Sequence, residues 1–168
     1  VIPSKVITLN NSAFKNCNSI IDITIPQSVG TNGGTIGSYV FANCDSLANI
    51  TIENHWIGEH MFDNIDCFND NGSKLESVVI PETVTIVDDY AFANNYNLTT
   101  ATLENKVVGD WMFFNCPKLN NVVVPKDAEI IGFGAFSGCI SLVEITIPFV
   151  GGHAYTGTDG EAEVLGYI

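Results

Sequence analysis

Basic residues are scarce in this sequence. Its 168 residues include 6 Lys and Arg residues against 19 Asp and Glu residues, so the formal net charge is −13. A field of this sign repels a nucleic-acid backbone and an anionic membrane surface, and no cluster of basic residues offsets it. We therefore expect no nucleic-acid partner and no binding to an anionic membrane.

Long apolar runs are also absent. The sequence has no apolar run of about 18 residues or more, the length that a transmembrane helix needs. The opening VIPSKVITL begins without Met and has no basic segment followed by an apolar one, so it does not read as a secretory leader. We expect the sequence to be a piece of a longer chain, with any export signal or anchor outside it and no direct membrane insertion by this piece.

Residue patterns that carry chemistry are missing as well. There is no C-x-x-C pair, which argues against a zinc site. No nucleophile is marked beside His55, His60 or His153, so a Ser-His-Asp arrangement is not indicated. For His55 and His60 we favour solvated turn residues, with a metal site beside Glu53 and Glu59 as the alternative. We expect no catalytic residue, no cofactor and no metal.

The segment DNIDCFNDNGSKLE has the composition of a calcium loop. Aligning Gly72 with the invariant glycine of an EF-hand places Cys67 at the first ligand and Val78 at the last, so that pattern fails. Irregular, weak calcium binding around Asp66 to Gly72 stays open.

A repeat runs through the sequence instead. A phenylalanine recurs every 21 to 30 residues, an aliphatic residue usually follows it by six positions, and an I-x-I-like pair comes next. The phenylalanines are Phe14, Phe41, Phe62, Phe92, Phe113 and Phe136. The pairs are Ile23 and Ile25, Ile50 and Ile52, Val78 and Ile80, Ala101 and Leu103, Val122 and Val124, and Ile145 and Ile147. The alternation within each pair predicts a short strand, which Pro26, Pro81, Pro125 and Pro148 end.

A period in the twenties is that of a leucine-rich-repeat-type solenoid. We expect a β-rich coil of about six turns, here called rungs, each with one short parallel strand and with turns or short helical segments opposite. One rung cannot bury its apolar residues alone, but stacked rungs can. The array is expected over residues 1–150, with a partial rung at the start. Residues 151–168 are rich in glycine and are expected to be a cap or a junction to a following module.

Equivalent positions of the rungs form columns. Two residues after each Phe the column holds Asn, with Gly once, which indicates a positive φ or an amide bonded to the next turn. The following column is Cys17, Cys44, Ile65, Asn95, Cys116 and Cys139. We expect these cysteines to be reduced, buried fillers. Disulfides between neighbouring rungs, or a metal, are the alternatives.

Two surfaces are candidate binding sites. One is the outer face of the predicted strands, with the columns Asp22, Asn49, Ser77, Thr100, Asn121 and Glu144, and Thr24, Thr51, Val79, Thr102, Val123 and Thr146. The other is a column two residues before each Phe, which reads Ser12, Tyr39, His60, Tyr90, Trp111 and Gly134. Its rings are expected either to pack on one another or to form a stacking ladder for a sugar chain or a protein.

The combined pattern A-F-x-x-C-x-x-L-x-x-I-x-I-P resembles the BspA-like leucine-rich repeat. GAFSGCISLVEITIP, YVFANCDSLANITI and WMFFNCPKLNNVVVP carry it best. The resemblance implies a secreted or surface-anchored protein of bacteria or some protozoa, adhesion to host or matrix proteins, and no catalytic residues.

We therefore expect a non-enzymatic recognition module that is extracellular or at the cell surface. Its expected partner is a host or matrix protein bound through the strand face. A structural spacer and a glycan-binding module using the aromatic column are the alternatives.

Overall fold

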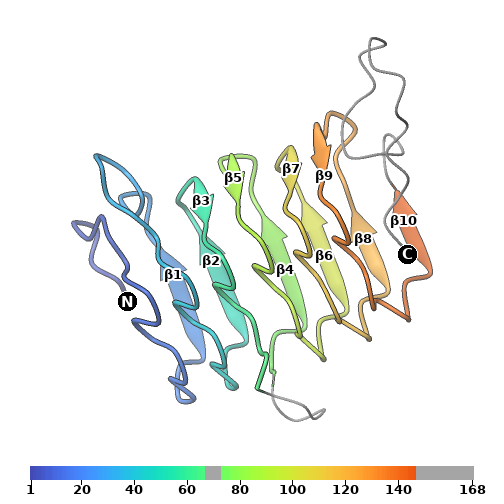
Figure 1. Ribbon diagram of the computed structural model, residues 1–168, viewed down its shortest axis with the longest axis horizontal. Helices are drawn as coiled ribbons and strands as arrows, with labels where there is room; N and C mark the ends of the chain where they lie inside the picture. Colours follow the sequence, from blue (N-terminus) through green and yellow to red (C-terminus); the bar gives the residue numbers. More distant parts are fainter. Residues whose placement is uncertain (67–72, 147–168) are drawn as a thin grey trace.

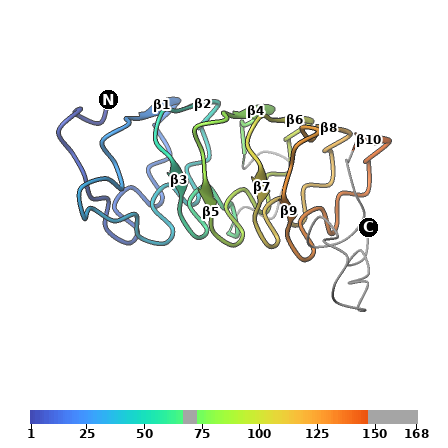
Figure 2. The same ribbon diagram turned by 90° about the horizontal axis from the view of Figure 1, so that it is seen from above.

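The computed structural model describes residues 1–66 and 73–146, and they form a coil with parallel strands on two sides. One side carries the longer strands β1 (Asp22–Ile25), β2 (Asn49–Ile52), β4 (Ser77–Ile80), β6 (Thr100–Leu103), β8 (Asn121–Val123) and β10 (Glu144–Thr146). The other side carries the two-residue strands β3 (Trp56–Ile57), β5 (Ile86–Val87), β7 (Val107–Val108) and β9 (Ile130–Ile131). Figures 1 and 2 show these strands as two separate rows along the coil. The expected solenoid is confirmed.

The longer strands pair in the register that the repeat predicts. Asp22 lies opposite Asn49, and Ser77, Thr100, Asn121 and Glu144 follow one another across four strands. These strands form two sheets, β1-β2 and β4-β6-β8-β10. Within the described residues no backbone hydrogen bond joins β2 to β4, although the two are neighbours in the stack. This seam coincides with the third rung, where extra residues separate Phe62 from its strand.

Strand alternation sets what is buried. In β4 the side chains of Val78 and Ile80 are buried, whereas those of Ser77 and Val79 are exposed. Proline then ends the strand because it has no N–H for the ladder. Pro26, Pro81 and Pro125 also begin turns, since the carbonyl of each accepts from the N–H three residues on, as from Val84 to Pro81.

The phenylalanine column is the centre of the core. Successive rings stack with centroids 5.1 to 5.8 Å apart, from Phe14 to Phe136. Phe41, Phe92 and Phe113 are fully buried, whereas Phe14 at the first rung is only partly buried. The column crosses the seam without a break, because Phe62 and Phe92 stack at 5.1 Å. The core is therefore continuous where the sheet is not.

The side opposite the longer strands contains turns and short strands, and no helix occurs in the described residues. Of the two alternatives expected there, turns are confirmed, and no short helical segment is observed in the described residues. Left-handed residues recur four positions apart in the same rung, as with Tyr39 (φ 60°) and Asn43 (φ 55°), or Trp111 (φ 54°) and Asn115 (φ 56°). A right-handed helix cannot run through residues at positive φ, so each rung turns repeatedly instead.

The asparagine column behaves as predicted. Asn16, Asn43, Asn94 and Asn115 have positive φ, as does Gly138. Their amides also bond between rungs: the Nδ2 of Asn43 donates to the Oδ1 of Asn16 at 3.3 Å, and that of Asn115 to Asn94 at 2.9 Å. Both expected roles, turning the chain and joining the turns, are therefore present.

The cysteine column faces backbone carbonyls. Cys17, Cys44, Cys116 and Cys139 are free, and all but Cys17 are buried. Each buried thiol points at the carbonyl oxygen of the phenylalanine one rung earlier, with Sγ to O distances of 3.2 to 3.4 Å. Cys44, Cys116 and Cys139 match the expectation of reduced, buried fillers, whereas Cys17 is reduced but only half-buried, and these four form no disulfide. Cys67 lies outside the described residues.

Asn95 occupies the cysteine slot in the fourth rung and makes the same bond. Its Nδ2 donates to the carbonyl of Phe62 at 3.0 Å. Its Oδ1 accepts from Asn64 at 2.6 Å and from Ser73 at 3.0 Å. An amide can replace the thiol here because the third rung brings two additional donors to it.

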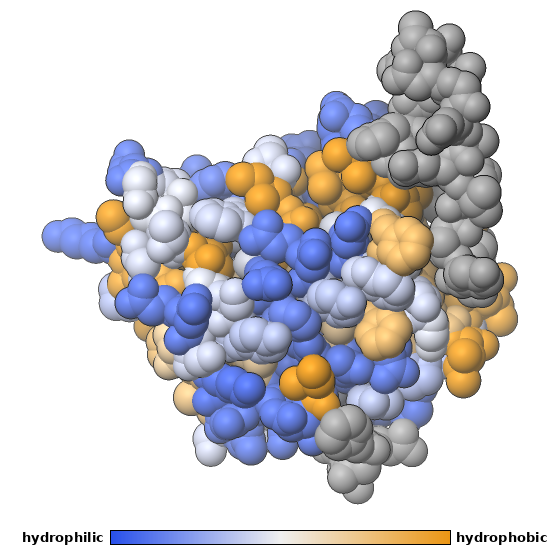
Figure 3. All heavy atoms as spheres, viewed as in Figure 1, coloured by the Kyte–Doolittle hydropathy of each residue, from blue (hydrophilic) through white to orange (hydrophobic). Residues whose placement is uncertain are grey.

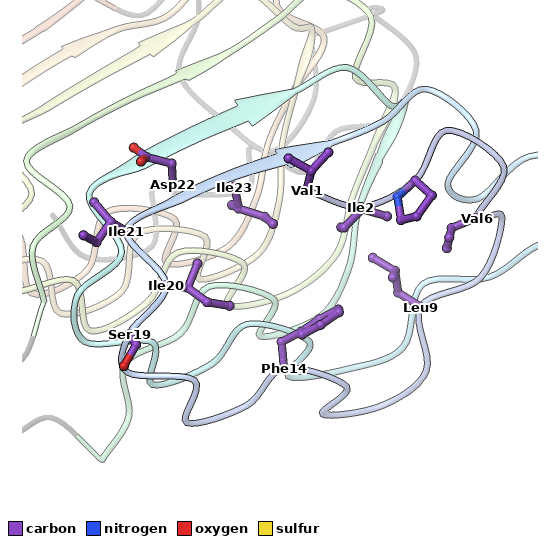
Figure 4. Close-up of a pocket in the computed structure, with 11 residues that line it drawn as sticks. Val1, Ile2, Val6, Leu9, Phe14, Ser19, Ile20, Ile21, Asp22 and Ile23 are labelled. Atoms are coloured by element: carbon purple, nitrogen blue, oxygen red, sulfur yellow. The ribbon is translucent and has the colours of Figure 1, made fainter.

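The N-terminal end of the coil exposes the core. A cavity of about 460 Å³ lies there, lined by members of the core columns such as Leu9, Phe14 and Ile23. Figure 4 shows these side chains pointing toward one another beneath β1. The cavity is the open end of the repeat core rather than a site built around convergent polar groups.

The described part of the chain has neither a membrane-spanning helix nor a cluster of metal-ligating side chains. None of residues 1–66 and 73–146 belongs to a helix able to cross a membrane. The same residues contain no group of three or more His, Cys, Asp or Glu side chains arranged to hold a metal ion. Most of the loop considered for calcium, residues 67–72, lies outside the described residues, as do His153 and the expected terminal segment 151–168.

Candidate recognition surfaces

The outer face of β1, β2, β4, β6 and β8 carries the two columns expected there. Asp22, Asn49 and Ser77 are exposed, and Thr100 and Asn121 are half-buried. The Nδ2 of Asn49 donates to the Oδ1 of Asp22 at 2.6 Å, so this column also bonds along the stack. Register places Glu144 beside Asn121.

The second column on this face is β-branched. Thr24, Thr51, Val79, Thr102 and Val123 follow one another, and register places Thr146 beside Val123. Val79 is 50% exposed and Val123 is 46% exposed. The strand face thus combines short polar side chains with exposed aliphatic ones, and both kinds suit contact with another protein.

The strand face is interrupted at the seam. A shallow hollow of about 620 Å³ lies at one end of the seam, lined by Ile21, Ser46, Ala48, Asn49, Lys74, Glu76 and Ser77. The ladder beneath this face is therefore broken once, between β2 and β4.

The aromatic column is a stack of parallel rings. Centroid distances are 4.4 Å from Tyr39 to His60, 4.8 Å from His60 to Tyr90 and 5.9 Å from Tyr90 to Trp111, with interplanar angles of 9° or less. All four residues have φ between 50° and 60°. The packing alternative is therefore observed, with left-handed backbone beneath each ring.

Both ends of the stack are covered. The Nζ of Lys15 lies 5.3 Å from the centroid of Tyr39, a cation–π distance. At the other end, a β-carbon built on Gly134 would lie 2.5 Å from the Trp111 ring, so glycine is required there. The flat faces of the rings are thus occupied, and a ligand meets ring edges. Sugar stacking needs an open ring face, which this column does not offer.

His60 is tied to a buried carboxylate. Its Nδ1 lies 2.6 Å from the Oδ2 of Asp63, whose Oδ1 accepts from Asn94 at 2.8 Å. Burial raises the pKa of the Asp63 carboxyl, and the bonds from Asn94 and His60 act in the opposite direction. This contact fixes the His60 ring in the stack and gives it a structural role.

Two further columns on the side of β3, β5, β7 and β9 were not identified from the sequence. One is apolar and holds Trp56, Ile86, Val107 and Ile130. The other immediately precedes the aromatic column and holds Ser38, Glu59, Asp89, Asp110 and Phe133. Reading every column of the repeat, rather than those around the Phe, would have revealed both.

The comparisons with known proteins agree with the repeat. A family model described as "BspA type Leucine rich repeat region" matches in six copies over residues 1–70 and 64–152. No protein with a curated description matches the chain.

Three solved structures share the fold. A leucine-rich cell surface protein from Faecalibacterium prausnitzii A2-165 is 25% identical with a TM-score of 0.52, over 84% of this chain and 29% of its own. The leucine-rich repeat protein of T. pallidum is 25% identical with a TM-score of 0.55. The match covers 83% of this chain and 75% of that protein's chain. A leucine-rich repeat protein from Eubacterium ventriosum is 26% identical with a TM-score of 0.50. The match covers 88% of this chain and 32% of that protein's chain. The chain thus spans less than a third of the first protein.

Proposed function

Because the chain belongs to the BspA-type leucine-rich repeat family, we propose that it is a non-enzymatic recognition module of a secreted or cell-surface protein. In this proposal it mediates adhesion by binding a host or matrix protein through the outer face of β1, β2, β4, β6, β8 and β10. A surface location is supported by the likeness to a protein described as a leucine-rich cell surface protein.

The observation that carries the proposal is the chemistry of the strand face. The side chains in its two columns are short, so little side-chain entropy is lost when a partner docks. Exposed Val79 and Val123 add apolar area, and the Asp22 and Asn49 column adds hydrogen-bonding groups. With roughly 4.8 Å between strands, the face extends about 25–30 Å along the stack. An area of this size suits a weak or moderate protein contact.

Charge adds a condition on the partner. The net charge of −13 favours basic partners, and screening of surface charges weakens such binding at high salt. We therefore expect the affinity for a matrix protein to fall as the salt concentration rises.

The test is a binding screen of the purified chain against matrix proteins and a glycan array. A hit is then measured again with Thr100→Lys, on the strand face, and with Thr83→Lys, an exposed turn residue elsewhere in the rung. We expect Thr100→Lys to weaken binding at least tenfold and Thr83→Lys to leave it unchanged.

Two outcomes contradict the proposal. Equal effects of the two lysine variants would remove the strand face as the site. Absence of any protein ligand in the screen would favour a spacer role in a longer protein.

A further inference from the structure

The side of the coil with the two-residue strands carries a partly exposed apolar row. Trp56, Ile86, Val107 and Ile130 occupy equivalent outward positions in β3, β5, β7 and β9. Ile86 is 42% exposed, and Phe133 nearby is 57% exposed. In Figure 3 apolar side chains gather over β5, β7 and β9, with hydrophilic side chains beside them. The described residues place no other element over this row.

A row of carboxylates runs beside it. Glu59, Asp89 and Asp110 are exposed and occupy the same position in three successive rungs, and Asp88 lies next to Asp89. Their backbones belong to the turn ladder: the carbonyls of Glu59, Asp89 and Asp110 accept from the N–H of the aromatic residue one rung earlier, at 2.9 to 3.0 Å. The carboxylates are therefore held at the spacing of the rungs on a rigid support.

Neutral groups hold two carboxylates of this row, Glu59 and Asp110, and the neighbouring Asp88 in place. Glu59 accepts from the Ser38 hydroxyl at 2.7 Å, and Asp88 from the Trp56 indole N–H at 2.7 Å. Asp110 accepts from the Phe133 backbone N–H at 2.8 Å. Neutral donors orient the carboxylates without cancelling their charge. The nearby Lys106 is engaged elsewhere, with Glu129 at 3.2 Å and Asp127 at 3.6 Å.

The carboxylates also repel one another. The pKa of Asp89 is raised by burial first, and then by the charges of Asp110, Glu59 and Asp88. A bound cation between the rungs relieves this repulsion, which the fold itself leaves in place. The surface is therefore complementary to positive charge spaced along the stack.

From these two parallel rows we propose that this side, here called the second face, is a docking surface for a basic, apolar-bearing extended segment of a partner protein. Lysine or arginine side chains of the segment contact Glu59, Asp89 and Asp110, and its apolar side chains lie on Ile86, Val107 and Ile130. An extended segment suits the site because side chains alternate along it and reach two adjacent rows. This inference goes beyond the strand-face proposal, since it concerns the other side of the coil.

The experiment measures binding of a fluorescent peptide of alternating lysine and leucine to the whole chain. Two control peptides replace leucine by serine or lysine by glutamate. We expect saturable binding of the lysine-leucine peptide, weaker binding of the lysine-serine peptide and none of the glutamate-leucine peptide. Raising the salt concentration from about 50 mM to about 500 mM should weaken binding several-fold, because exposed charge pairs are screened.

Matched variants locate the site. The double variant Glu59→Gln with Asp89→Asn should lower the affinity for the lysine-leucine peptide about fivefold to tenfold, as expected for the loss of two exposed charge pairs. The pair Asp22→Asn with Glu76→Gln makes the same change in net charge on the strand side and should have little effect. Ile86→Thr should weaken binding about threefold. Val79→Thr, on the strand face, should leave it unchanged.

Several results would overturn this inference. They are no saturable binding, an equal loss of affinity in the two double charge variants, or tight binding of the glutamate-leucine peptide. Binding lost only in Asp22→Asn with Glu76→Gln would move the peptide to the strand face. That result would overturn the second face while leaving the strand-face proposal intact. Thermal unfolding of every variant checks that each one is folded.

Discussion

At the scale of single residues, the aromatic column contains an unusual combination. Tyr39, His60, Tyr90 and Trp111 all adopt the left-handed conformation, which costs a residue with a β-carbon roughly 1–2 kcal/mol. Stacking against neighbouring rings offsets this cost, since aromatic pairs contribute about 0.5–1.5 kcal/mol each beyond burial. Only Gly134 in this column indicates the left-handed backbone in the sequence. The sequence therefore predicts the stacking, whereas the backbone conformation becomes evident only in the structure.

This combination predicts that glycine destabilises the fold less than alanine does at position 90. Tyr90→Ala removes three ring contacts and keeps the unfavourable φ of 57°, whereas Tyr90→Gly removes the same contacts and the strain together. We expect Tyr90→Ala to be less stable than Tyr90→Gly by about 1 kcal/mol, the reverse of the usual order in a helix or strand. Urea unfolding of both variants measures this difference. A more stable alanine variant would show that φ at this position relaxes.

The buried thiols give a second prediction at this scale. Burial raises the pKa of Cys44 and of Cys139 to about 11, so at pH 8 both remain thiols and react slowly. We expect iodoacetamide at pH 8 to leave Cys44, Cys116 and Cys139 unmodified in the folded chain and to modify them in urea. Peptide mass mapping measures each site. Rapid modification of Cys116 in the folded chain would contradict its burial.

The same pKa values fix the direction of the alkaline response. A thiol whose folded pKa lies above its unfolded value stabilises the fold below the unfolded pKa, and this contribution is lost as pH rises toward the folded one. Replacing Cys139 by Ala should therefore reduce the fall in melting temperature between pH 9 and pH 11. An unchanged pH profile in Cys139→Ala would assign the alkaline loss to other groups.

At the scale of elements, the repeat predicts the longer strands, their register and the phenylalanine core, because one side-chain column then explains many positions at once. It does not predict β3, β5, β7 and β9. A two-residue strand has no alternation to detect, and Trp56 and Ile57 read only as the approach to the next turn. The repeat does not predict the seam either. The extra residues of the third rung indicate an insertion, but they do not indicate whether ladder hydrogen bonds form between β2 and β4.

The position of an element in the stack sets its energetic weight. Phe92 is fully buried and stacks on two rings, at 5.1 and 5.8 Å, whereas Phe14 stacks on one and is partly exposed. We expect Phe92→Ala to lower the free energy of unfolding by roughly 3–5 kcal/mol. Phe14→Ala should cost clearly less, because an end rung has one neighbour. Denaturant unfolding compares the two, and equal losses would contradict the stacked core.

At the scale of the whole molecule, the charge of −13 opposes folding through self-repulsion. The pKa values of Asp63 and Asp89 are raised, by burial first in both cases. For a carboxyl with a raised folded pKa, the folded state binds the proton more tightly, so stability increases as pH falls toward the ordinary carboxyl range. We expect the melting temperature to rise on acidification from pH 7 toward about pH 5.

Calorimetric scans across this pH range measure the effect. The Asp89→Asn variant serves as the comparison, since it lacks one of the two groups and should show a smaller rise. A melting temperature that falls steadily on acidification would contradict the direction assigned to both carboxyls.

The seam between β2 and β4 divides the outer face of the longer strands into two plates. The plates are joined across the seam by the phenylalanine stack, by the turn ladders and by the β3-β5 ladder on the other side of the coil. The joint is therefore bonded on one side of the coil and unbonded between the longer strands. A partner that lies on both plates crosses this unbonded line, whereas a partner confined to the β4-β6-β8-β10 plate meets one unbroken ladder.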